Sequence, residues 1–165
     1  MFRSGRAVAA AIEAAGTGTE APLPAVAIQP NGVDLTVERV FEQQSAGHVG
    51  RDGKSIGDRA EVDPVGDDPP TYRLPPGGYI VRYGEVLCVP EEHVGFVLPR
   101  STLLRNACTL NTAVWDAGYE GRGEGLLQVH HEIEIEQGAR IGQFVLSGAE
   151  HEGTYGGSYQ GENTP

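Results

Sequence analysis

The sequence predicts an all-β protein: a distorted jelly-roll-like β-barrel or sandwich with a short N-terminal helix and a mobile C-terminal tail. The 165 residues include 24 glycines and 11 prolines, which favours many turns over long helices. Short apolar runs also follow one another between turn residues through the second half of the chain, a spacing typical of all-β sandwiches and barrels. A chain of this length can bury roughly 70% of its unfolded surface, so we expect one domain over residues 1–165.

Residues 1–25 are predicted to form a short helix and a linker. Ser4 is a suitable N-cap, and Gly16 can end the helix. The apolar face at helical spacing consists of Val8, Ile12 and Ala15. The small residues of 17–24 then predict a linker.

A second irregular region spans residues 42–70. It is rich in glycine, aspartate, serine and proline and shows no apolar periodicity. We therefore expect an acidic, exposed insertion there.

Strands are predicted where β-branched and apolar residues cluster between turns. The expected runs are 78–82, 85–89, 94–98 and 141–146. The clearest period-two pattern covers residues 129–136. Its first face consists of Val129, His131, Ile133 and Ile135, and its second face of His130, Glu132, Glu134 and Glu136. This alternation predicts one strand with a single wet face.

Residues 154–165 are predicted to be mobile. They contain three glycines and two tyrosines but almost no aliphatic side chains, so they lack the means to anchor themselves in a core. Tyr155, Tyr159 and Gln160 supply rings and polar atoms that can cover a bound ligand. We therefore predict a flexible, lid-like tail, with an exposed terminus of no function as the alternative.

The net charge limits the kinds of molecule that this protein is expected to bind. The net charge is −11, from 23 acidic and 12 basic residues, and the pI is near 4.8. This argues against nucleic-acid binding, which requires a basic surface, although a few arginines in a pocket still suit a compact anion. Lys54 is the only lysine, and acidic, lysine-poor chains suit a high-salt cytoplasm. No run of about 18 apolar residues is present, so no membrane-spanning helix is expected.

Several chemical classes are excluded by what the sequence lacks. Cys88 and Cys108 have no CxxC spacing and are predicted to be small core residues of a cytoplasmic, reducing compartment. No P-loop is present, and no cysteine pattern matches a zinc deaminase. The His130–Glu132 run resembles a metal site, but adjacent residues of a strand point to opposite faces, so a surface strand is the better interpretation.

Four short, polar, turn-rich islands carry the functional signal. They are residues 29–35, 98–105, 111–121 and 138–143, with the glycine-rich segment 155–161 behind the last. Each has an ordinary structural explanation when taken alone; Asp116, for example, suits a simple turn. Arg100 and Ser101 also suit a phosphate, because a guanidinium and the free N–H groups of a helical turn both favour anions.

Taken together, the islands resemble the dUTPase and dCTP deaminase superfamily, and most of all its archaeal-type dUTPases. The matching stretches within residues 28–160 are Gly-Val-Asp-Leu, Pro-Arg-Ser-Thr-Leu-Leu-Arg, Thr-Ala-Val-Trp-Asp-Ala-Gly-Tyr-Glu-Gly, Arg-Ile-Gly-Gln and Tyr-Gly-Gly-Ser-Tyr-Gln. The resemblance implies a jelly-roll-like homotrimer with active sites between subunits. It also implies hydrolysis of dUTP to dUMP and pyrophosphate with Mg²⁺, which keeps uracil out of DNA and supplies dUMP for dTTP synthesis.

The resemblance also implies roles for individual residues. Asp116 matches the catalytic aspartate that orients and deprotonates the attacking water. Tyr119 matches the aromatic residue beneath the deoxyribose, and Asp34 matches a carboxylate that holds Mg²⁺ through a bound water. The implied substrate-binding residues are Arg100, Ser101, Arg105, Ala113, Gln143, Tyr155, Tyr159 and Gln160.

Departures from the deaminase pattern keep two alternatives open. A deaminase needs a glutamate in the strand after the Gly-Tyr-x-Gly turn. This sequence has Leu126 there by ungapped counting, or Gln128 if two residues are inserted, although Glu124 shares their strand face. Ser158 stands where deaminases commonly carry lysine. The alternatives are therefore a dCTP deaminase, alone or combined with dUTPase activity, and a non-catalytic nucleotide-binding module, which predicts the loss of Asp116 or the arginines.

Overall fold

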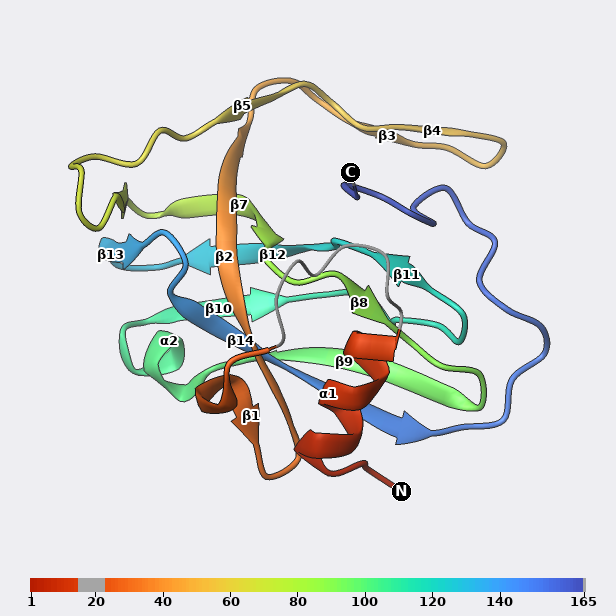
Figure 1. Cartoon of the computed structure of the whole chain (residues 1–165). Helices are drawn as coiled ribbons and strands as arrows, with labels where there is room; N and C mark the ends of the chain where they lie inside the picture. Colours follow the sequence, from red (N-terminus) through yellow and green to blue (C-terminus); the bar gives the residue numbers. More distant parts are fainter. Residues whose placement is uncertain (15–22, 165) are drawn as a thin grey trace.

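The computed structural model describes residues 1–14 and 23–164, most of which lie in strands and their connections (Figure 1). The helices are α1 (Gly5–Ala14), the 3₁₀ helix η1 (Ala25–Ala27) and α2 (Ser101–Arg105). The strands are β1 (Ile28–Gln29), β2 (Gly32–Gln43), β3 (His48–Val49), β4 (Lys54–Ser55), β5 (Arg59–Glu61), β6 (Thr71–Leu74), β7 (Gly77–Tyr83), β8 (Leu87–Cys88), β9 (His93–Pro99), β10 (Cys108–Asn111), β11 (Glu120–Gly121), β12 (Glu124–Val129), β13 (Ile133–Glu136) and β14 (Arg140–Gly148). The predicted all-β class is confirmed.

An antiparallel sheet in the order β10-β12-β7-β2-β14-β9 forms the body of the molecule. Its first and last strands, β10 and β9, contact each other, so the sheet curls into a nearly closed barrel (Figure 1). Strand β2 crosses the whole body: residues 33–36 pair with β14, and residues 37–42 pair with β7, with a register shift between Val37 and Arg39. Bulges of this kind bend a strand, which lets one strand serve two parts of a barrel.

Alternate side chains of the long strands fill the barrel. In β12, for example, Gly125, Leu127 and Val129 are buried while the residues between them are more exposed, as period-two geometry requires. The largest fully buried side chains of the strands are Tyr72, Tyr83, Phe144, Leu35, Leu74, Leu87, Leu127 and Leu146. This core supports the loops and strand ends that carry the functional residues.

Helix α1 packs across β2, β1 and β14. The Ser4 hydroxyl accepts a hydrogen bond from the Ala7 N–H at 3.4 Å, in agreement with its predicted N-cap position. Val8 and Ile12 are buried as predicted. Ala15, Gly16 and the predicted linker 17–22 lie outside the described residues.

Two expectations about regularity were wrong. The alternating run 129–136 is two strands, because β12 ends at Val129 and the chain turns through 130–132 before β13 pairs with β6. The insertion 42–70 is not irregular: β2 continues into it, β3 and β4 pair as a hairpin, and β5 pairs with the end of β2. Strand β13 is decided by its pairing with β6, which is distant in sequence. The strands of the insertion are too short to show a periodic pattern in the sequence.

Cys88 and Cys108 are free thiols, as predicted. Burial raises the pKa of both thiols, which disfavours the reactive thiolate. Among residues 1–14 and 23–164, no helix has the length and apolar character needed to span a membrane.

The packing of α1 makes a prediction about stability. Ile12 is 1% exposed, so Ile12→Ala should lower the free energy of unfolding by roughly 2–4 kcal/mol through lost burial and a residual cavity. Glu13→Ala, at an exposed position of the same helix, is the control and should change it by less than about 0.5 kcal/mol. Urea unfolding at fixed protein concentration measures both. Equal values for the two variants would show that α1 does not belong to the core.

Candidate active site

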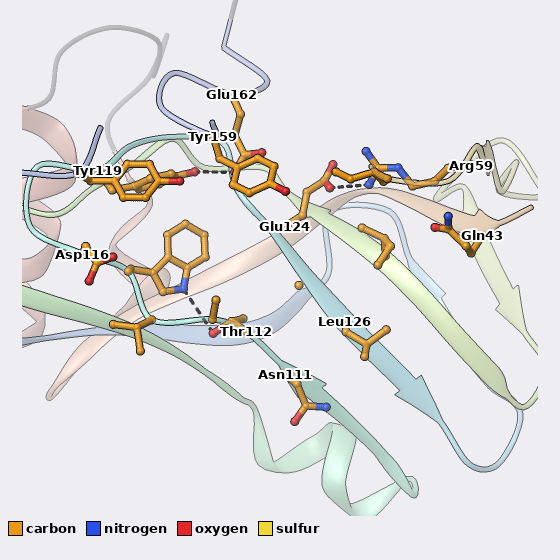
Figure 2. A pocket seen from close by; sticks show the side chains of 17 residues that line it. Gln43, Arg59, Asn111, Thr112, Asp116, Tyr119, Glu124, Leu126, Tyr159 and Glu162 are labelled. Atoms are coloured by element: carbon orange, nitrogen blue, oxygen red, sulfur yellow. Dashed lines mark hydrogen bonds and ion pairs between the residues drawn. The ribbon is translucent and has the colours of Figure 1, made fainter. Parts of the chain in front are cut away.

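A pocket of about 710 Å³ lies against strands β7 and β12 (Figure 2). It is lined by Gln43, Ile56, Arg59, Ile80, Asn111, Thr112, Ala113, Val114, Trp115, Asp116, Tyr119, Glu124, Gly125, Leu126, Tyr155, Tyr159 and Glu162. Asp116 and Tyr119 lie at one end of the view, while Arg59 and Gln43 lie at the other. The walls of the pocket therefore come from four parts of the chain: the barrel, the loop after β10, the insertion and the C-terminal segment.

The loop between β10 and β11 is fixed by backbone hydrogen bonds. Trp115 and Gly95 exchange two bonds of 2.8 and 3.1 Å, and Val89 bonds both Gly118 and Tyr119. The Tyr119 N–H donates to the Asp116 carbonyl at 3.1 Å, while Gly118 has a φ of +81°. These are the features of a type II turn, whose third position favours glycine. The turn leaves Asp116 exposed at the pocket and buries Tyr119.

Aromatic rings form one wall of the pocket. The Trp115 and Tyr119 rings meet edge to face with centroids 4.9 Å apart, and Tyr155 meets Tyr119 at 5.6 Å. The Tyr119 hydroxyl donates to Glu162 Oε1 at 3.0 Å. Burial and the Glu162 charge raise the pKa of Tyr119, so this hydroxyl stays protonated. The wall is apolar and rigid, which suits the face of a sugar or a planar base.

A neutralised carboxylate forms the wall beside it. Glu124 binds Arg59 at 2.6 Å through Oε2 and Arg82 at 3.1 Å through Oε1. Both guanidinium groups lie over the Phe41 ring, at 5.2 and 5.0 Å. Glu162 lies close to this group. Its pKa is raised, mainly by burial and further by the Glu124 charge, while Arg82 and Arg59 partly oppose the rise.

A second cluster surrounds Asp34 on β2, and we call it the arginine cluster. Asp34 Oδ2 accepts hydrogen bonds from Arg140 at 3.1 Å and Gln29 at 3.1 Å, and it forms an ion pair with Arg100 at 3.0 Å. Gln143 is the cross-strand partner of Asp34. The Asp34 side chain is 3% exposed, whereas about a third of each arginine side chain is exposed. Two guanidinium groups are thus held side by side by one buried carboxylate and keep surface available for an anion.

Comparison with known proteins identifies the family. The sequence model for a group described as dCTP deaminase-like matches residues 2–149. The chain belongs to this family. A relative from Halobacterium salinarum, named "Probable deoxyuridine 5'-triphosphate nucleotidohydrolase", is 58% identical over 140 residues, covering 83% of this chain and 85% of the relative. One of the same name from Aeropyrum pernix is 44% identical over 142 residues, covering 82% and 86%.

A solved structure agrees at the level of fold. The 2'-deoxycytidine 5'-triphosphate deaminase from Agrobacterium tumefaciens superposes with a TM-score of 0.66 at 19% identity. The match covers 88% of this chain and 47% of that chain. The predicted membership of the dUTPase and dCTP deaminase superfamily, and its jelly-roll-like fold, are confirmed.

Within this dCTP deaminase-like fold, the predicted site residues fall into separate groups. Ala113, Asp116, Tyr119, Tyr155 and Tyr159 line the pocket. Asp34, Arg100 and Gln143 belong to the arginine cluster. Ser101 and Arg105 begin and end the exposed turn α2.

Gln160 does not line the pocket. Its amide instead donates to the Gly118 carbonyl at 3.0 Å and accepts from the Glu120 N–H at 3.3 Å. These hydrogen bonds fasten the C-terminal segment to the loop in the ligand-free chain, and the contact of Gln160 with a nucleotide stays a prediction.

The residues around Asp34 do not fit a magnesium site. A cation next to this carboxylate would face two guanidinium groups already bound to it. Among residues 1–14 and 23–164, no cluster of three or more His, Cys, Asp or Glu side chains could hold a metal ion. The geometry instead makes Asp34 the counter-ion that orients the arginines.

The register of β12 bears on the deaminase alternative. Leu126 pairs with Ile80 and lines the pocket, whereas Gln128 lies two residues further on and is not among the lining residues. Glu124 does line the pocket, but Arg59 and Arg82 occupy both its oxygens. Neither an isobutyl group nor a doubly ion-paired carboxylate is suited to shuttle protons at a pyrimidine ring.

Several residues of the site were missed by sequence reasoning. They are Arg140, Arg59 and Glu162. Arg140 had a signal, because it begins the Arg-Ile-Gly-Gln of a matching island, but no role was predicted for it. Arg59 and Glu162 had none, since their partners are 65 and 43 residues away in the chain.

The arginine cluster predicts a stability effect. Asp34→Asn removes a buried charge that binds two guanidinium groups, so the free energy of unfolding should fall by roughly 1.5–3 kcal/mol. Asp52→Asn, in an exposed turn, is the matched control and should be neutral. Urea unfolding at fixed protein concentration tests both variants. An Asp34→Asn protein as stable as the control would contradict the ion pairs described above.

Proposed function

We propose that this chain hydrolyses dUTP to dUMP and pyrophosphate. The observation that carries the proposal is the turn 116–119, which holds an exposed carboxylate and a buried aromatic ring side by side on one wall of the pocket. The relatives named as probable dUTP nucleotidohydrolases support the same substrate.

Asp116 is assigned as the general base. Its carboxylate orients a water for in-line attack on the phosphorus nearest the sugar and takes the proton of that water. A bond forms between the water oxygen and this phosphorus, and the bond to the bridging oxygen breaks, which releases pyrophosphate. Tyr119 is assigned to the deoxyribose, because a buried ring packed against Trp115 leaves little room for a 2'-hydroxyl.

The triphosphate contacts are assigned to a neighbouring subunit. Arg100, Ser101, Arg105 and Gln143 are the predicted phosphate ligands, yet the pocket that contains Asp116 is lined by other residues. We therefore propose a homotrimer whose active sites lie between subunits. The exposed Leu98 and Leu104 flank Arg100, at 55% and 56% exposure, and such apolar side chains suit a surface buried on assembly.

The divalent cation is assigned to the substrate. Mg²⁺ keeps most of its waters and is commonly held through phosphates and few protein carboxylates, so the proposed substrate is the complex of dUTP with Mg²⁺. The proposed location is the cytoplasm, which suits two free cysteines. No role for nucleic acid or membrane is proposed for a chain of net charge −11.

A product assay distinguishes the proposal from its alternatives. The protein is incubated with Mg²⁺ and dUTP, dCTP or dTTP, and the products are separated. Release of dUMP and pyrophosphate supports the proposal, and dUTP formed from dCTP supports a deaminase. Binding without turnover indicates a non-catalytic module. The retained Asp116 and arginines, and the apolar Leu126, favour the first outcome.

The role of Asp116 predicts a kinetic split. Asp116→Asn should lower turnover of dUTP by roughly 10²- to 10⁴-fold, the contribution typical of a general base, and leave the dissociation constant within a few fold. Pyrophosphate release and calorimetric titration measure the two quantities, with Glu132→Gln as an exposed-surface control. Near-normal turnover in the Asp116 variant would remove it from the mechanism.

The C-terminal segment yields a second functional prediction. Deletion after Gly153 removes Tyr155, Tyr159 and Glu162 from the pocket and should reduce turnover roughly ten-fold or more, because water would then enter the site freely. The thermal unfolding midpoint, compared with that of the full chain, reports whether the fold survives. A truncated protein that hydrolyses dUTP at the full-length rate would show that the tail has no catalytic role.

A further inference from the structure

The insertion and the C-terminal segment meet over the pocket. In Figure 1, the β3–β4 hairpin extends from β5 to lie beside the C-terminal end of the chain. Ile56 and Arg59, from the hairpin side, line the pocket together with Tyr159 and Glu162, from the terminal side. Two segments about a hundred residues apart in sequence therefore enclose the same space.

A cation–π contact joins the two segments. The Lys54 Nζ atom, on β4, lies 4.8 Å from the centroid of the Tyr159 ring, within the range in which an ammonium is attracted to a ring face. Lys54 is the only lysine of an otherwise arginine-based set, and Tyr159 itself lines the pocket.

Charge complementarity extends this junction. The hairpin side supplies Arg59, whose guanidinium binds Glu124 at 2.6 Å. The terminal side supplies Glu162, whose pKa is raised by burial, an effect that the nearby Arg59 partly opposes. Glu162 is held in turn by the Tyr119 hydroxyl. Lys54 and Arg59 of the insertion and Arg82 of the barrel thus supply the positive charges. The C-terminal segment supplies the Tyr159 ring and the Glu162 carboxylate near them.

We infer that Lys54 is a positioning residue, which holds the Tyr159 ring, and with it the C-terminal segment, over the pocket. The insertion then acts as the receptor for the C-terminal segment. The contact itself is a property of the ligand-free protein; its value for catalysis rests on the proposed function.

Hydrogen exchange tests the contact without any substrate. Lys54→Ala should speed amide exchange in peptides covering residues 154–164 by roughly two- to five-fold, the effect expected for losing one exposed cation–π contact. Lys54→Arg keeps a cation and should restore most of the protection. Arg51→Ala removes a positive charge from the turn of the same hairpin and is the matched control, with unchanged exchange expected.

The reciprocal variant tests the same contact from the other side. Tyr159→Leu should speed exchange in residues 48–55, whereas Tyr159→Phe keeps the ring and should not. Unchanged exchange in both Lys54→Ala and Tyr159→Leu would overturn the inference. An equal effect of Arg51→Ala and Lys54→Ala would also overturn it, because net charge and not the ring contact would then be responsible.

Steady-state kinetics separates this inference from the proposed function. In Lys54→Ala, KM for dUTP should rise two- to five-fold with kcat changed less, and Lys54→Arg should recover it. If the wild-type protein leaves dUTP intact, the proposed function fails while the exchange result still decides the role of Lys54. If dUTP is hydrolysed and the amides of residues 154–164 exchange at the same rate in wild type and Lys54→Ala, only the present inference fails.

Discussion

Both parts of the site depend on the pairing of strand β2 with two different neighbours. Its first half pairs with β14, which places Asp34 opposite Gln143, and its second half pairs with β7. Its last residue, Gln43, lines the pocket and pairs with Arg59 of the insertion. The strand changes neighbours between Thr36 and Val37, and the register shift that follows bends it at this point. A one-residue slip would reverse every side chain of β2 and turn Asp34 away from its arginines.

An acidic chain can still build local positive charge where buried or part-buried carboxylates are paired with arginine. Asp34 binds Arg100 and Arg140, Glu124 binds Arg59 and Arg82, and Glu38 binds Arg122 at 3.1 Å. A planar guanidinium binds two partners at fixed geometry and is more weakly hydrated than an ammonium, so it suits these part-buried positions. Each of the first two groups holds two cations for one carboxylate. The net charge of −11 therefore says little about the potential at either group.

The sequence was informative wherever a local pattern decided the structure. The buried face of α1, the strands around Val81, Val97 and Phe144, and the turn that presents Asp116 all follow from periodicity and from turn chemistry at Gly118. Five of the residues predicted for the site, Ala113, Asp116, Tyr119, Tyr155 and Tyr159, also line the pocket. These features are encoded within a few residues of one another.

The errors have a common origin in long-range pairing. The pattern at 129–136 favours one strand, but Val129 pairs with Cys108 and Gly77 while Ile135 pairs with Tyr72, in different sheets. The insertion is mostly exposed, and within it β5 pairs with the end of β2 while β3 and β4 pair with each other. The hydrogen bonds of the Gln160 amide to the backbone of residues 118 and 120 also join segments about 40 residues apart. Such partners are set by the fold as a whole, and the spacing of residues in the sequence does not predict them.

The distribution of acidic groups in the pocket explains why one chemistry is favoured over its neighbour. Deamination requires a carboxylate that can exchange a proton at the pyrimidine ring, whereas hydrolysis of a phosphoanhydride requires one that can orient a water. Glu124 is fixed between two guanidinium groups, and the next residue on its face is the apolar Leu126. Asp116 instead stands exposed at a turn whose backbone is fastened on both sides. This contrast between a doubly ion-paired Glu124 and an exposed Asp116 is why the proposed proton transfer is assigned to Asp116.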